Sequence, residues 1–203
     1  MKTTTLLFSL LITCLLASAQ VKLETIVKPG TKLIYAVESG RKKYDFIVTV
    51  KKLSPLVFDW QMTDPVNTSG TITHTAKAMI SANTMYNFFS AGPKKLDGKT
   101  ISVWLSKNTF AGVMKAGKGI MMKMNVGAEP KQMGTYTGGL PLEIIVDGET
   151  KTIDEELVTE LSKNGVPADN DNDFFTVYPS AKLPVILRMQ NGFHIELKEI
   201  KTK

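Results

Sequence analysis

The sequence predicts a mainly β (α+β) fold, with a curved antiparallel sheet or half-barrel and two or three short helices. Apolar and polar residues alternate with a period of two through much of the chain. Aromatic and β-branched residues are concentrated in these runs, and turn residues separate them. Such alternation places one set of side chains in a core and the other in water.

The first half of the chain contains three such runs. They cover residues 33–37, 44–50 and 56–62, and Ser39-Gly40 interrupts the alternation between the first two. Each run predicts a strand with one buried face.

The middle of the chain predicts shorter elements. Residues 71–91 begin as a strand and become compatible with a helix. Residues 101–105 predict a strand, followed by a short helix that Ser106 caps. Further along, Asp147-Gly148 suits a two-residue hairpin turn.

Residues 154–165, with the sequence DEELVTELSKNG, predict a helix. Asp154 is a suitable N-cap, two glutamates follow in the first turn, and Asn164-Gly165 ends the segment. Apolar residues between these ends form a stripe at helical spacing.

The chain ends in a predicted hairpin over residues 183–197, which turns at Asn191-Gly192. The sequence contains no long linker, internal repeat or low-complexity tract. We therefore expect residues 20–203 to form a single β-rich domain.

Residues 1–19 have the pattern of a secretory signal peptide. Lys2 precedes an apolar core from Leu6 to Leu16, and the segment closes with a small-x-small pattern from Ala17 to Ala19. The core is too short for a membrane span. We expect cleavage near Ala19 and a periplasmic or extracellular location.

Cys14 is the only cysteine, and it lies within this segment. A lipidated Cys14 is the alternative interpretation, but Thr13 is a poor residue before such a site and Leu15-Leu16 continue the apolar core. After cleavage the chain would contain no cysteine. This excludes disulfides, thiol nucleophiles and cysteine metal sites from the mature protein.

The charge distribution limits the classes of partner. The chain has a formal net charge of +6, with lysines scattered along it. No arginine cluster or interleaving of aromatic and basic residues suggests a nucleic-acid surface. An anionic envelope polymer is a secondary candidate partner. No later stretch approaches the roughly 20 apolar residues of a transmembrane helix.

Three alternating aspartates, Asp169, Asp171 and Asp173, form the candidate metal site. Their spacing matches the first ligands of a helix-loop-helix calcium site. Such a loop also requires a glycine and a glutamate where this chain has Phe174 and Ser180. The alternative is a solvated polar connection between two elements.

The sequence offers few residues for catalysis, so we expect no enzyme. Only His74 and His194 are present, and His194 is expected to project into solvent. No G-x-S-x-G elbow occurs. An unrecognised hydrolase is the alternative, and it would require a histidine beside an acid and a hydroxyl.

Several segments together resemble secreted β-rich proteins of Gram-negative envelopes. They are KPGTKLIYAV, FDWQMTDP, ISVWLSK and LPVILRMQNGFHIELKEI, which span most of residues 28–200. The resemblance implies the half-barrel of the lipoprotein-carrier type and an envelope location. It carries over no functional residues.

A concave sheet with aromatic and methionine side chains predicts noncatalytic binding of a lipid or other apolar small molecule. Thioethers also bind copper, but no histidine lies near the methionines in sequence, so we expect no cofactor. The alternative function is a structural or protein-interaction module of the cell envelope. The candidate wall residues are Phe58, Trp60, Met62, Trp104, Met122 and Met124.

Overall fold

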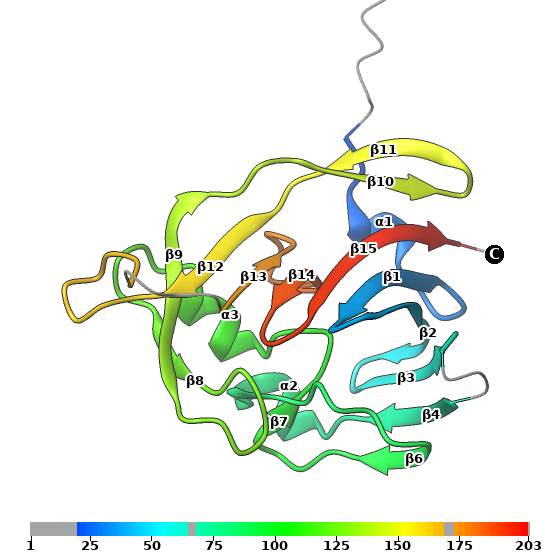
Figure 1. Cartoon of the computed structure of the whole chain (residues 1–203), viewed down its shortest axis with the longest axis horizontal. Helices are drawn as coiled ribbons and strands as arrows, with labels where there is room; N and C mark the ends of the chain where they lie inside the picture. The colour runs from blue at the N-terminus through cyan, green and yellow to red at the C-terminus, as the bar shows by residue number, and fades with distance from the viewer. Residues whose placement is uncertain (1–19, 65–67, 169–172, 203) are drawn as a thin grey trace, which may run out of the picture.

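Most of the described chain forms one large curved sheet. The computed structural model describes residues 20–64, 68–168 and 173–202. The fold is mainly β, and the sheet curves without closing into a barrel (Figure 1). The predicted fold class is confirmed. The sheet is mixed, because the pairs β4–β6 and β10–β15 are parallel whereas its other described pairs are antiparallel.

The strands follow one another along most of the sheet. The order in the large sheet is β6-β4-β3-β2-β1-β15-β14-β13-β12-β9-β8, and β5 pairs with β7 in a separate small sheet. The strands are β1 (Lys32–Ser39), β2 (Lys42–Leu53), β3 (Leu56–Met62), β4 (Thr68–Thr73), β5 (Thr84–Met85), β6 (Gly92–Lys95), β7 (Thr100–Ile101), β8 (Ile120–Met122), β9 (Lys131–Gly138), β10 (Leu142–Val146), β11 (Glu149–Ile153), β12 (Glu156–Glu160), β13 (Phe174–Val177), β14 (Ile186–Gln190) and β15 (His194–Lys201).

The two predicted hairpin turns, Asp147-Gly148 and Asn191-Gly192, are confirmed, and a third hairpin forms where Ser39-Gly40 interrupts the alternation. Strands β1 and β2 pair up to Ser39 and Lys42, around Gly40. Asp147 and Gly148 both have positive φ angles, of 49° and 90°, as a two-residue type I′ turn requires. Strands β14 and β15 pair on either side of the Asn191-Gly192 turn.

Three helices occur in the described residues: α1 (Leu23–Ile26), α2 (Ala76–Ser81) and α3 (Lys107–Val113). The predicted cap of α3 is confirmed, because the Ser106 hydroxyl accepts a hydrogen bond from the Thr109 N–H at 3.1 Å. Thr75 caps α2 in the same way. None of the described helices combines the length and the apolar character that crossing a membrane requires.

The helix predicted over residues 154–165 is wrong, because strand β12 occupies this segment. β12 pairs with β13 on one side and with β9 on the other. The Glu155 carboxylate is buried, where it lies 3.3 Å from Arg188 Nη1 and accepts a hydrogen bond from the Thr176 hydroxyl at 2.8 Å. Helix propensity is a weak preference, and pairing on two edges outweighs it.

The strands of this region also form a long bent ribbon. β9 continues into β10, and β11 continues into β12, so the two pairs make one interrupted hairpin (Figure 1). Gly139 lies at the interruption, where a Cβ atom would be 2.2 Å from the Glu155 carbonyl oxygen. At the tip of the ribbon, β10 pairs with Glu199 and Ile200 near the end of β15. Strand β14 pairs with residues 194–196 at the start of the same strand.

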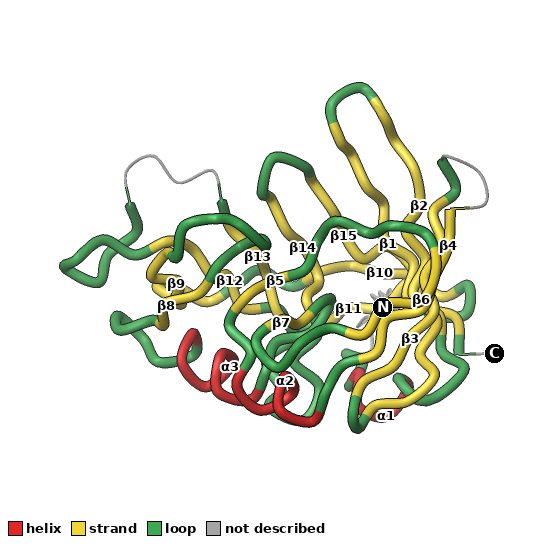
Figure 2. The backbone as a smooth tube through the Cα atoms, turned by 90° about the horizontal axis from the view of Figure 1, so that it is seen from below, coloured by secondary structure: helices red, strands yellow, loops and turns green. Residues whose placement is uncertain are grey.

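Helices and hairpins lie on opposite sides of the curved sheet. α2 and α3 line one side, whereas the β1–β2 and β14–β15 hairpins extend on the other (Figure 2). Close to the helices the interior is filled: the Phe58 ring lies 6.2 Å from Trp104 and 5.8 Å from His74. His74 precedes α2 by two residues and Trp104 precedes α3 by three, so both rings belong to segments that lead into the helices.

Candidate functional site

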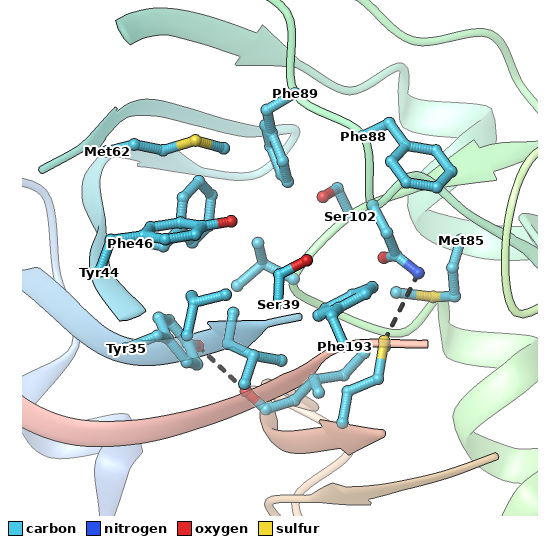
Figure 3. Close-up of a pocket in the computed structure, with 16 residues that line it drawn as sticks. Tyr35, Ser39, Tyr44, Phe46, Met62, Met85, Phe88, Phe89, Ser102 and Phe193 are labelled. Atoms are coloured by element: carbon cyan, nitrogen blue, oxygen red, sulfur yellow. Dashed lines mark hydrogen bonds between the residues drawn. The ribbon is translucent and has the colours of Figure 1, made fainter. Parts of the chain in front are cut away.

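A pocket of about 230 Å³ opens between the two extended hairpins and the loop of residues 86–91 (Figure 3). Its wall is mainly aromatic, aliphatic and thioether. The lining residues are Tyr35, Val37, Ser39, Tyr44, Phe46, Met62, Met85, Asn87, Phe88, Phe89, Ser102, Val103, Ile186, Met189, Phe193 and Ile195. The volume lies just below the ~300–1,000 Å³ typical of sites for drug-sized ligands, so the pocket fits a small molecule or one end of a larger one.

Phe89 is the centre of an aromatic cluster on one side of the pocket. Its ring centroid lies 4.6 Å from that of Phe46, 5.2 Å from Trp60 and 5.5 Å from Tyr86. These separations are within the range of favourable aromatic contacts. The cluster therefore holds the loop of residues 86–91 against strands β2 and β3.

The polar atoms in the deep wall of the pocket already have partners. The Tyr35 hydroxyl donates to the Ile186 carbonyl at 3.0 Å, and the Ser102 hydroxyl donates to the Tyr86 carbonyl at 2.7 Å. The Asn87 amide donates to the Met124 carbonyl at 2.6 Å. Burial raises the pKa of Tyr35, so this residue stays neutral. The deep wall therefore offers a ligand mainly apolar contacts.

The mouth of the pocket is more polar and more exposed. The hydroxyls of Ser39 and Tyr44 project into it (Figure 3), and neither forms a hydrogen bond with another described residue. Burial, followed by the charge of Asp64, raises the pKa of Tyr44. Phe88 also lines the pocket, although 66% of its surface is exposed. An exposed phenyl ring at a pocket mouth is an apolar surface that a ligand would cover.

Val103, which lines the pocket, has a strained backbone conformation. Its φ angle is 65°, a left-handed conformation that is unfavourable for a β-branched residue. The strand predicted over residues 101–105 is therefore wrong beyond Ile101, where β7 ends. The segment is held by hydrogen bonds from the Ser102 N–H to His74 Nε2 and from the Ile186 N–H to the Val103 carbonyl. Strain of this kind costs ~1–3 kcal/mol and is concentrated at functional sites.

Of the six predicted wall residues, the structure places Met62 in the pocket. Trp60 lies one layer behind it, in contact with Phe89, and is 2% exposed. Phe58, Trp104, Met122 and Met124 are buried in the core and do not line the pocket.

The pocket residues that sequence reasoning missed belong to the same alternating runs. Tyr35, Phe46 and Ile195 occupy inward positions of predicted strands, which the period of two identifies. The neighbouring pair Phe88-Phe89 carried a different signal, since two large aromatics in a segment with a weak strand pattern need a partner surface.

The two histidines are in different environments. His74 is 1% exposed, and both of its ring nitrogens have partners. Its Nδ1 atom lies 3.0 Å from the Leu56 carbonyl oxygen, and its Nε2 atom accepts a hydrogen bond from the Ser102 N–H at 3.1 Å. Burial lowers the pKa of His74 to about 4. His194 is partly exposed, and its Nε2 lies 3.7 Å from a Glu196 carboxylate oxygen.

The aspartate motif is only partly described. Asp169 and Asp171 lie outside the described residues. The Asp173 carboxylate is 3.0 Å from Lys131 Nζ, which also lies 2.6 Å from Glu160. Hydrogen bonds to Glu160 and Asp173 raise the pKa of Lys131. Within the described part of the chain, no three potential metal ligands cluster.

No protein-family model, curated protein or solved structure matches this chain.

Proposed function

We propose that the protein is a noncatalytic binder of a small apolar or amphiphilic molecule, which it holds in the pocket between the β1–β2 and β14–β15 hairpins. The observation that carries the proposal is the contrast between an open, mainly apolar pocket and polar groups in its deep wall that already have partners. Burying apolar ligand surface there gains ~25 cal/mol per Å², with few polar groups left to desolvate.

Secretion is part of the proposal. The signal-peptide pattern of residues 1–19 lies outside the described residues and supports a periplasmic or extracellular location. Gln20, the first residue after the predicted cleavage position, forms a bridge with Thr152.

The alternative, a module that pairs with a partner through a sheet edge, is disfavoured at one end of the large sheet. β6 forms one edge of the large sheet, and its sequence is Gly-Pro-Lys-Lys. Pro93 lacks the N–H that strand pairing needs, and exposed lysines on an edge strand oppose pairing with another chain.

The test is calorimetric titration of the purified protein with octanol, a neutral molecule with one apolar tail. In the Ile195→Trp variant an indole fills part of the pocket, and we expect octanol affinity to fall ~10-fold or more. The Ile47→Trp variant is the matched control, because Ile47 lies between the inward residues Phe46 and Val48 and faces the other side of the sheet.

Mass spectrometry of organic extracts of the protein complements this titration. We expect a small amphiphile in extracts of the wild-type protein and of Ile47→Trp, and much less in Ile195→Trp. If octanol does not bind and the extracts contain no apolar compound, the proposal is rejected.

A further inference from the structure

We propose that the natural ligand is a single-chain amphiphile with an acidic head group, whose tail occupies the pocket and whose head lies beside Ser39 and Lys42 at the mouth. This inference rests on the proposed binding function and names the chemical class of its ligand.

The register of the β1–β2 hairpin places a cation on the pocket face. Val37 is directly opposite Tyr44, and Ser39 is directly opposite Lys42. Residues directly opposite each other in an antiparallel pair project from the same face. Because Val37, Ser39 and Tyr44 line the pocket, Lys42 projects from the pocket face at the tip of the hairpin.

Of the other charges of the hairpin, Arg41 lies in the turn at its tip and adds a second cation there. Lys43 and Glu38 are opposite each other on the outer face, where they form an ion pair of 2.6 Å. Lys42 forms no ion pair with a described carboxylate. An acidic group, Asp64, is close enough to the mouth to act on Tyr44. An anionic head would therefore lie on the Ser39 and Lys42 side of the mouth, where the hydroxyl donates to it and the ammonium neutralises it.

The pocket limits the tail to a short length. Its volume of about 230 Å³ corresponds to ~eight non-hydrogen atoms at the ~30 Å³ that a water molecule takes in the liquid. Longer tails would extend over Phe88, whose ring is exposed at the mouth. A chain of about eight carbons is therefore a suitable probe.

The experiment compares octanoate, octanol and octylamine, which share the tail and differ in the head. At neutral pH and low salt we expect wild-type protein to bind octanoate ~2–5-fold more tightly than octanol, and octylamine more weakly than octanol, because one exposed charge pair contributes a modest free energy. The Lys42→Gln variant should lose the preference for octanoate and keep its affinity for octanol. Lys52→Gln, at the other end of the same strand, is the matched control and should behave as wild type.

The two proposals fail in different ways. If octanoate and octanol bind equally, the acidic head group is wrong and the apolar pocket stands. If Lys42→Gln keeps the preference for octanoate, the head group does not lie beside Lys42 and its proposed position is wrong. If octylamine binds best, the head group is cationic and the inference is overturned. If none of the three molecules binds, the proposed function itself fails.

Discussion

Strands β2 and β3 carry apolar side chains along most of their inner faces, and the two ends of these faces pack against different parts of the chain. Towards the helices, Phe58 packs against Trp104 and His74, and the interior is filled. Towards the hairpin tips, Phe46 and Met62 face a pocket. Period-two alternation is the same at both ends, so the strands alone do not decide which end is open. The segments that cross the concave face decide it.

These crossing segments differ in how they are held. At the filled end, His74 joins the Leu56 carbonyl to the Ser102 N–H, and α2 and α3 begin at capped residues beside it. At the open end, the covering segment is the loop of residues 86–91, which is held by the Phe89 ring and by hydrogen bonds of Tyr86 and Asn87, while Phe88 is exposed. A ligand can therefore be accommodated where the covering segment is a loop, whereas the helices leave no room.

The largest expected effect is on stability, from truncating one phenyl ring at each end. Phe58→Ala removes a fully buried ring and should lower the free energy of unfolding by ~3–5 kcal/mol, because a cavity remains in a close-packed interior. Phe193→Ala truncates a partly buried ring at a pocket that is already open, and should cost ~1 kcal/mol. Urea unfolding of both variants measures the difference. Equal losses would show that the two ends are packed alike.

The next effect is a dependence of stability on pH, which arises from His74 at the filled end. The pKa of His74 falls from 6.5 to about 4 on folding, so the unfolded chain binds more protons between these values. The neutral His74 ring makes its full contribution to the free energy of unfolding above pH ~6.5. This contribution is lost as the pH falls towards about 4, and the total loss is about 3 kcal/mol. His74→Gln should therefore lose less stability than wild type between pH 7 and about 4.5.

Urea unfolding at several pH values checks this prediction. If His74→Gln and wild type lose stability in parallel as the pH falls, His74 is not the buried neutral group described above.

The smallest expected effect is at the mouth of the pocket. Phe88→Ala removes a mostly exposed ring, so the free energy of unfolding should change by less than ~0.5 kcal/mol. Octanol affinity should fall about 2–5-fold, because the ligand loses apolar surface that it would cover. Calorimetry and urea unfolding of the same samples separate the two effects. A large loss of stability with unchanged affinity would make Phe88 a structural residue and not part of the site.

Much of the fold was predictable from local signals. The alternating runs, the Asp147-Gly148 turn and the Ser106 cap each act over a few residues, and all three are present in the structure. The segment DEELVTELSKNG was not predictable in this way. Its helical signals are genuine, but they compete with pairing to β9 and β13 and with the buried contact of Glu155 with Arg188, which the local sequence does not contain.

The candidate site was predictable only in its type of chemistry. Alternation identifies inward residues, and both Phe58 and Phe46 satisfy it. Whether such a residue meets a helix or a cavity depends on chain segments far away in sequence, such as Trp104 for Phe58 and Phe89 for Phe46. Of the predicted wall residues, Met62 therefore lines the pocket while Met122 lies in the filled core.

The most direct measurement uses the methionines as reporters of both ends. Met62, Met85 and Met189 line the pocket, whereas Met122 and Met133 are buried elsewhere in the core. In protein labelled with carbon-13 at the methionine methyl groups, titration with octanol should shift the NMR signals of the first three and leave those of Met122 and Met133 in place. Shifts confined to Met122 and Met133, or no shifts at saturating octanol, would contradict the assignment of the open end as the binding site.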